Sequence, residues 1–137
     1  MARLFVAAST QDLSYVSAAG AAPIIAYPFS ISLWFKPTGV GVAQVYFEIG
    51  ISTSAFSRWT ITTVAATNFV SFASRASAGG AVSATTSNAI TAGNWQHVVA
   101  VATSVTNRII ILNGVAGSQG SNVTSNAGPG ATATLTT

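Results

Sequence analysis

Residues 93–114, GNWQHVVAVATSVTNRIIILNG, constrain the fold of this chain more than any other stretch. Two runs rich in valine and isoleucine are separated by a short polar loop and bounded by turn residues, which is the pattern of two β-strands joined in a hairpin. Asn113-Gly114 ends the second run, and this dipeptide tolerates the positive φ angles of a tight hairpin turn. The segment therefore predicts a fold rich in β-strands.

Further strand-like runs occur along the whole chain. Residues 29–36 alternate between apolar and mostly polar side chains, as in a sheet with one packed face. The predicted inward set is Phe29, Ile31, Leu33 and Phe35, and the predicted outward set is Ser30, Ser32, Trp34 and Lys36. Other runs cover residues 4–8, 44–51, 59–64, 69–75 and a Ser/Thr-rich stretch that follows Gly79-Gly80 and ends at Thr86.

The strand after Trp95 is apolar on both faces, so it is expected to be central in its sheet and covered on both sides. We predict that one set contributes to the core together with the inward residues of 29–35, namely Val99, Val101, Ile109 and Ile111.

No window shows the 3.6-residue apolar stripe of a helix, and many short runs are separated by Gly-rich turns. This pattern predicts an all-β, antiparallel β-sandwich or jelly roll. Residues 1–137 are expected to form a single domain. Residues 113–137 are polar and free of charge, so part of this terminal segment is expected to be loop.

Two motifs carry a family resemblance. Phe29, Ile31, Trp34, Phe35, Lys36 and Pro37 match an early Phe-x-Ile-x-x-Trp-Phe-Lys-Pro strand, and Gly93, Trp95, His97 and Val98 match a later Gly-x-Trp-x-His-Val. With the Asn-Gly hairpin, these residues resemble the laminin G-like branch of the concanavalin A-like lectin/glucanase jelly rolls. Relatives of this kind continue with strands that close the sandwich. The chain is therefore a shortened version, a fragment, or a chain whose closing strands come from a partner.

Charge patterning excludes several classes of partner. Lys and Arg number five and Asp and Glu two, and the basic residues are scattered rather than clustered, so nucleic acid is not expected as a ligand. No run approaches the roughly 20 apolar residues of a membrane span, and membrane insertion is not expected. So few charges leave little repulsion between copies, which favours a protein that packs against neighbours.

Enzymatic chemistry lacks the residues it needs. Glycoside hydrolysis uses two carboxylates that face one bond, but the chain holds only Asp12 and Glu48, far apart in sequence. His97, beside a tryptophan in the matched motif, is interpreted as a structural imidazole. We therefore expect no enzyme and no catalytic residues.

Cofactors are not expected either. Calcium is the usual cofactor of the resembled family, and a tight calcium cage needs carboxylates together with carbonyl oxygens. With two acids, no metal site is predicted, although Asp12 beside the carbonyls of the Asn and Gly turns would be the first place to look.

Three aromatic residues are candidates for contact with a glycan or a partner: Trp34, Phe56 and Trp59. Trp34 shares its face with Ser30, Ser32 and Lys36 and could stack on a sugar ring, although burial under a loop is expected for it. Phe56 lies in a loop-like run and would suit an apolar partner.

These observations favour a non-enzymatic assembly protein that packs against copies of itself or against a viral capsid or tail protein. Short laminin G-like chains of this kind resemble phage decoration or tail-associated proteins, which implies a place in the virion. The alternative is an extracellular carbohydrate-binding lectin module for host-surface glycans.

Overall fold

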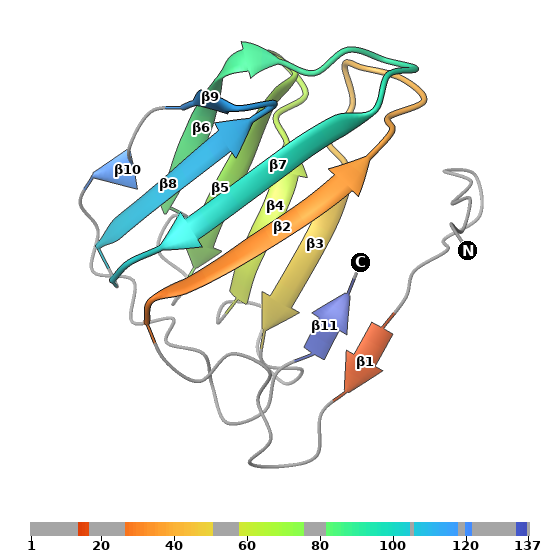
Figure 1. The fold of residues 1–137 in the computed structure, drawn as a ribbon. Helices are drawn as coiled ribbons and strands as arrows, with labels where there is room; N and C mark the ends of the chain where they lie inside the picture. The colour runs from red at the N-terminus through yellow and green to blue at the C-terminus, as the bar shows by residue number, and fades with distance from the viewer. Residues whose placement is uncertain are drawn as a thin grey trace.

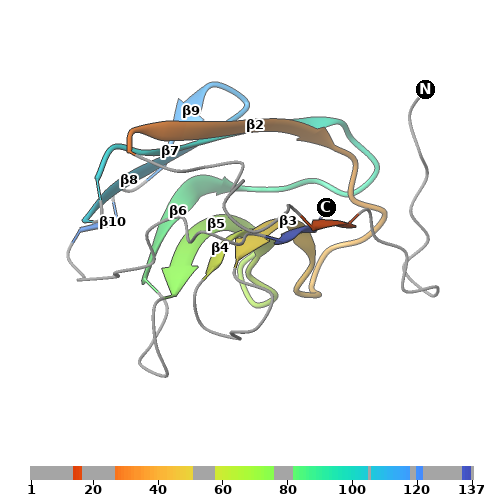
Figure 2. The ribbon, with the colours of Figure 1, turned by 90° about the horizontal axis from the view of Figure 1, so that it is seen from below.

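The computed structural model describes residues 14–16, 27–50, 58–75, 82–104, 106–117, 120–121 and 134–136. Every regular element within these residues is a β-strand, and neighbouring strands pair antiparallel. The strands form two sheets (Figure 1), and the view from below shows the sheets as two stacked layers (Figure 2). The prediction of an all-β sandwich is confirmed. The described residues contain no helix long and apolar enough to cross a membrane.

The first sheet has the strand order β1-β11-β3-β4-β5-β6. Its strands are β1 (Ser14–Val16), β11 (Thr134–Thr136), β3 (Val45–Gly50), β4 (Arg58–Thr63), β5 (Phe69–Arg75) and β6 (Val82–Ala89). β11 pairs with β3 on one side and with β1 on the other. The polar C-terminal segment therefore extends this sheet from within the chain, without a partner's strand.

The second sheet has the order β10-β8-β7-β2, and β9 also pairs with β8. Its strands are β2 (Phe29–Phe35), β7 (Gln96–Ala102), β8 (Asn107–Leu112), β9 (Val115–Ala116) and β10 (Gly120–Ser121). β7 lies between β2 and β8, so its predicted central position is confirmed. The expectation that it is covered on both sides was wrong, because its outward residues are only half-buried. β2 forms one margin of the sheet, as Figure 1 shows.

Turn chemistry places the strands where the sequence predicted them. Asn113 and Gly114 adopt φ angles of 52° and 82° and form the tight turn between β8 and β9. The predicted runs 29–36, 44–51, 59–64 and 69–75 differ from β2 to β5 by at most one residue at either end. β6 continues to Ala89, beyond the predicted end at Thr86. The run at residues 4–8 and the Gly79-Gly80 turn lie outside the described residues.

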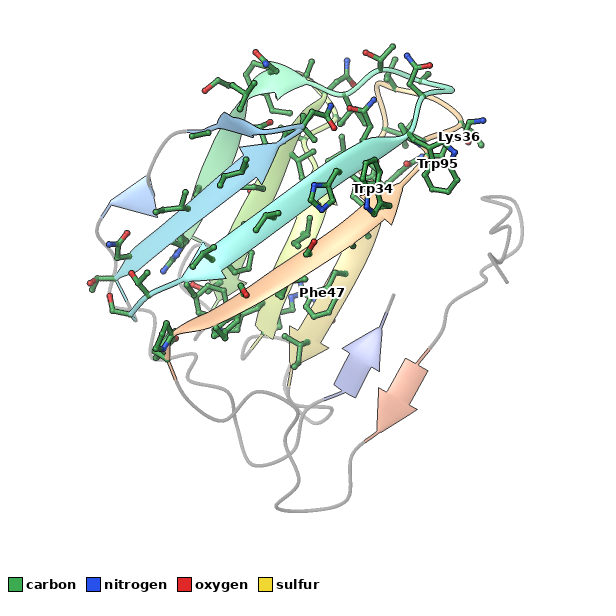
Figure 3. The ribbon with its side chains drawn as sticks, viewed as in Figure 1. Trp34, Lys36, Phe47 and Trp95 are labelled. Carbon is green, nitrogen blue, oxygen red and sulfur yellow. The ribbon has the colours of Figure 1, made fainter. Side chains whose placement is uncertain are left out.

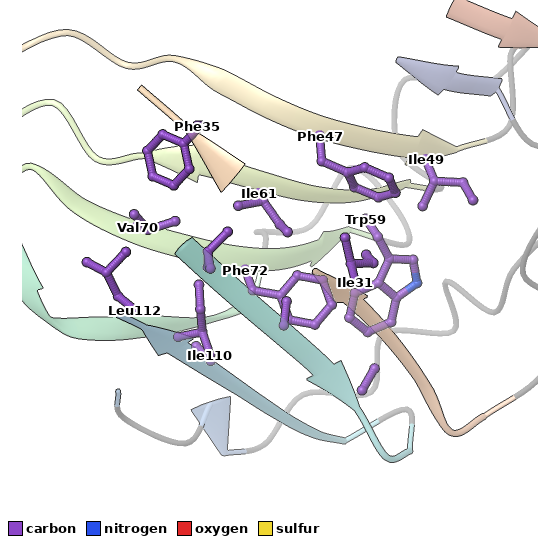
Figure 4. Close-up of a cluster of buried hydrophobic side chains, with 14 of the residues drawn as sticks. Ile31, Phe35, Phe47, Ile49, Trp59, Ile61, Val70, Phe72, Ile110 and Leu112 are labelled. Carbon is purple, nitrogen blue, oxygen red and sulfur yellow. The ribbon is translucent and has the colours of Figure 1, made fainter. Parts of the chain in front are cut away.

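The core fills the space between the sheets, where Figure 4 shows large side chains of both layers interdigitating. As predicted, Ile31 and Phe35 of β2 are buried, and Phe29 and Leu33 pack against the same cluster. The prediction was wrong for β7 and β8, because Val99, Val101, Ile109 and Ile111 are on the outward face. The inward residues are instead Val98, Ala100 and Ala102 of β7 with Ile110 and Leu112 of β8, each at most 1% exposed.

The physical reason for this reversal lies in the opposite sheet. Trp59 of β4 and Phe72 of β5 bring two large rings into the core, where they lie 5.0 Å apart between centroids. The small side chains of Ala100 and Ala102 leave room for those rings, whereas valines such as Val99 and Val101 in their place would compete for the same volume. Strand pairing then fixes the face that β8 turns inward. Strand alternation alone is equally compatible with either face.

Candidate functional site

The outward surface of the second sheet is the most distinctive exposed feature among the described residues. We call it the outer face and define it by Ser30, Ser32 and Trp34 of β2, His97, Val99 and Val101 of β7, and Ile109 and Ile111 of β8. Register places them together, because Ser32 pairs with Val99 and Val99 pairs with Ile111. Side chains of paired residues project from the same side of a sheet. Four aliphatic side chains thus lie half-buried on a surface without Lys, Arg, Asp or Glu.

Trp34 is 65% exposed, so the expectation that a loop buries it was wrong. Inward and outward side chains alternate strictly along β2, and the side that carries Trp34 points away from the first sheet. Figure 3 shows the indole on the outward side of β2. Trp34 is thus accessible for contact with a glycan or a protein.

His97 supports Trp34 from the neighbouring strand. The two rings stack with centroids 4.7 Å apart and an interplanar angle of 27°. A hydrogen bond of 2.9 Å joins His97 Nε2 to Ser32 Oγ. The imidazole is therefore held by a hydroxyl and an indole, as expected for a structural histidine, and the pair fixes one face of Trp34 in place.

The Asn-Gly turn anchors the same end of β7. The Asn113 amide Oδ1 accepts a hydrogen bond of 2.9 Å from the His97 backbone N–H, and the His97 carbonyl accepts one of 2.8 Å from the Asn113 N–H. Asn113 Nδ2 donates a further bond of 2.7 Å to the Oε1 of buried Gln96. The Asn-Gly turn thus fixes the backbone of His97, and His97 in turn stacks on Trp34.

A second tryptophan lies at this end of the sheet. Trp95 is 57% exposed and directly precedes β7, while Lys36 directly follows β2. The Gly93 N–H donates a hydrogen bond of 2.8 Å to the Pro37 carbonyl, which holds the two segments together beyond the paired strands. Figure 3 shows Trp95 and Lys36 beside Trp34. At this end of the outer face, the exposed indole of Trp34 is therefore accompanied by the indole of Trp95 and the ammonium group of Lys36.

The other aromatic candidates have different outcomes. Trp59 is only 2% exposed, so the prediction that it contacts a glycan or partner was wrong. It faces inward from β4 and packs edge-on against Phe29 at 5.2 Å between ring centroids. Phe56 lies outside the described residues. The Tyr46 hydroxyl donates to Gln44 and accepts from Thr63, which places this half-buried ring in the core margin.

Glu48, the acid that the structure describes, pairs with a neighbouring arginine. Glu48 Oε2 lies 3.4 Å from Arg58 Nη1, an ion pair between adjacent strands whose side chains are partly exposed. The residues that the structure describes contain no group of three or more potential metal-ligating side chains. Asp12, the suggested first place for calcium, lies outside them. Within the described residues, the Glu48 carboxylate thus pairs with Arg58.

Arg108 is a buried cation, which its place among the scattered basic residues of the sequence did not indicate. It faces inward from β8, and its guanidinium carbon lies 5.2 Å from the centroid of the Trp59 ring. Burial lowers the pKa of Arg108, and the nearby Tyr27 phenol opposes this shift. The guanidinium remains charged at neutral pH. Because Arg108 is enclosed in the sandwich, its role is structural.

Sequence reasoning missed Trp95 and the outward direction of the four aliphatic residues. Trp95 entered the sequence argument only through the family motif, although a tryptophan between Asn94 and Gln96 at a strand start is a candidate for exposure. The aliphatic residues carried no such signal, because both faces of β7 are apolar. Only the pairing of the strands reveals them as a surface.

Comparison with known proteins agrees with this architecture. The model of the Laminin_G_3 family, described as the concanavalin A-like lectin/glucanases superfamily, matches residues 10–136. A search of the curated proteins found no match. The family match spans both motif-bearing strands and β11. The chain therefore belongs to the Laminin_G_3 family of the concanavalin A-like lectin/glucanase superfamily.

Proposed function

We propose that this chain is a non-enzymatic assembly protein that packs through its outer face against copies of itself or against a capsid or tail protein of a virus particle. The observation that carries the proposal is the group of aliphatic side chains, Val99, Val101, Ile109 and Ile111, on an uncharged outward surface. Protein interfaces have cores that are apolar, rich in aromatic residues and poor in charge.

The same surface is poorly equipped for sugars over most of its area. A glycan needs hydrogen-bonding groups for its hydroxyls beside an aromatic platform. The four aliphatic residues offer neither. The virion setting is supported by the low charge of the whole chain and by the resemblance to short phage laminin G-like proteins.

A lectin function is the second candidate, and one observation favours it. Trp34 and Trp95 are exposed at one end of the outer face, beside Ser32, Lys36 and His97. An indole with a neighbouring hydroxyl and ammonium group can stack on a sugar ring and bind its hydroxyls. Family membership is consistent with this lectin-like use.

Co-sedimentation with virus particles of the chain's own source tests the assembly function. Ile111→Asp places a carboxylate in the middle of the apolar surface and is expected to abolish binding to particles. Ser83→Asp is the matched control, because Ser83 is exposed on β6 of the other sheet. Loss of binding in both variants, or in neither, would reject the outer face as the contact.

A glycan array on the same samples tests the lectin function. A chain that ignores particles but binds a defined glycan, and loses that glycan on Trp34→Ala, would reject assembly in favour of recognition. Hydrolysis is not expected, so incubation with the bound glycan should release no product. Turnover that disappears in Glu48→Gln would overturn the non-enzymatic assignment.

A further inference from the structure

One edge of β2 has no strand partner in the part of the chain that the structure describes, where β2 pairs only with β7. Figure 1 shows β2 at the margin of its sheet. An open edge presents backbone donors and acceptors that another strand can pair with. We propose that two copies of this chain pair through their β2 strands, antiparallel and about a twofold axis at Ser32.

The hydrogen bonds of β7 show which β2 residues face the open edge. His97 uses both its N–H and its carbonyl on Asn113, at the side of β7 away from β2. His97 is opposite Trp34 in the β2–β7 register, so His97 and Trp34 form a non-hydrogen-bonded pair. The backbone groups of Trp34, and by alternation those of Ser30 and Ser32, therefore point to the open edge.

Among the described strands, the other long edge, that of β6, is protected, whereas no described segment covers the free edge of β2. β6 at the end of the first sheet has an irregular register against β5, and its Ser87 Oγ donates a hydrogen bond of 3.1 Å to the Ala116 carbonyl of β9. Gly117 lies so close to β6 that a Cβ there would overlap the Thr85 carbonyl oxygen. β1, β9 and β10 have only two or three residues each. β2 has seven residues, regular pairing and no charged side chain.

The sequence of β2, FSISLWF, is close to a palindrome about Ser32. With Ser32 opposite its own copy, Ser30 lies opposite Trp34 of the second copy, and all three edge-facing residues form hydrogen-bonded pairs. The residues between them match by type, since Phe29 lies opposite Phe35 and Ile31 opposite Leu33. Shifting the strands by two residues loses at least one of these three pairs, so this register is preferred.

Charge and burial also suit a second copy. The two Lys36 ammonium groups would be eight residues apart along the paired strands, about 27 Å, which is well beyond the Debye length at physiological salt. Phe29 and Leu33 are only half-buried, although they face the core. Apolar side chains from the inward face of a second β2 would cover this remaining surface.

The dimer deepens the proposed function, on which its biological meaning rests. Pairing would join the two β10-β8-β7-β2 sheets into one and place both outer faces on the same side. The two Trp34 side chains would then lie about 14 Å apart. A partner lattice would meet a doubled apolar surface, and binding at both halves would raise the apparent affinity.

Sedimentation velocity of the full chain over a range of concentrations tests the inference. A dimer is expected, and its dissociation constant should rise at least tenfold in Ser32→Pro. This change removes an N–H that faces the open edge and leaves the bonds of Ile31 and Leu33 to β7, as edge prolines do. Ser32→Lys should act similarly, because it puts two like charges on the twofold axis.

Two matched controls separate pairing from other effects. Ser32→Ala removes the hydroxyl but keeps the backbone donor, so it should still dimerise. Ser83→Lys adds the same charge at an exposed position of β6, away from the β2 edge, and should also dimerise. The chain has no cysteine, so a short bismaleimide should link Ser32→Cys copies and leave Ser83→Cys copies as monomers. Circular dichroism confirms that each variant is folded.

A folded wild-type monomer, even at high concentration, would overturn the inference and would indicate that the edge is covered otherwise. A dimer that survives Ser32→Pro would also overturn it, because association would then use another surface. The proposed function fails separately. If Ile111→Asp leaves particle binding intact, the outer face is not the contact, whatever the state of the β2 dimer.

Discussion

The inner and outer faces of β7 and β8 are both rich in aliphatic residues, yet only the inner face is fully buried. On β7 the inner face carries Val98 and the small Ala100 and Ala102, all fully buried, whereas the outer face carries Val99 and Val101, which are half-exposed. The alternation along β7 and β8 therefore does not distinguish the packed face from the exposed one. The comparison shows that complementarity to the opposite layer selects the packed face, and that aliphatic residues on the other face remain available for contacts.

The largest expected effect is the loss of stability when a charged residue is introduced on the inner rather than the outer face. Ala100→Asp would place a carboxylate without a designed partner between the sheets, and we expect a loss of at least about 4 kcal/mol in the free energy of unfolding. Val99→Asp, one residue earlier but on the outer face, should cost about 1 kcal/mol because the carboxylate reaches water. Urea denaturation measures both. Equal losses would contradict the assignment of the faces.

A smaller effect is expected from removing methyl groups on β8. Ile110→Ala empties a fully buried position and should lower the free energy of unfolding by about 2–5 kcal/mol. Ile111→Ala changes a half-buried position and should cost about 1 kcal/mol. Ile111→Ala should weaken particle binding, whereas Ile110→Ala should leave it unchanged under conditions where the variant is folded. A reversed order of the two stabilities would place Ile111 in the core.

The smallest effect concerns the tyrosines that border the inner face. Burial raises the pKa of Tyr27, opposed by the Arg108 charge, and burial raises the pKa of Tyr46, opposed by the hydrogen bond from Thr63. Above about pH 10 the unfolded chain loses phenolic protons that the folded chain keeps. Stability should therefore be unaffected below pH 10 and fall above it, by at most about 1.4 kcal/mol per pH unit for each phenol.

Alkaline unfolding curves of the wild type and of the Tyr27→Phe/Tyr46→Phe variant check this expectation. The double variant lacks both phenols and should show a flatter dependence above pH 10. The same steep decline in both proteins would assign the effect to other groups.

Local sequence features predicted the strands because they act over a few residues. The alternation of residues 29–35 required a strand with one packed face, and Asn113-Gly114 allowed the positive φ angles of the turn before β9. The outward direction of Trp34 followed from the same alternation. Its exposure did not, because exposure depends on whether another part of the chain covers the face.

The candidate site could be predicted only in part for the same reason. Trp34 was among the predicted contact residues, but Trp59 was wrong, since its strand belongs to the opposite sheet and directs the ring inward. Trp95 was overlooked as a contact. The local sequence does not distinguish the buried tryptophan from the two exposed ones, because each is one large ring in a β-rich stretch.

The sequence by itself determined the all-β class, most strand positions, the Asn-Gly hairpin and the family, because periodicity and turn chemistry are local. Only the tertiary structure decided which face of β7 and β8 is buried, that Arg108 lies over Trp59, and that β11 joins β3 while β2 stays at a margin. These features depend on volume and pairing between segments far apart in the chain. A strand that is apolar on both sides acquires an inside only when a second sheet packs against it.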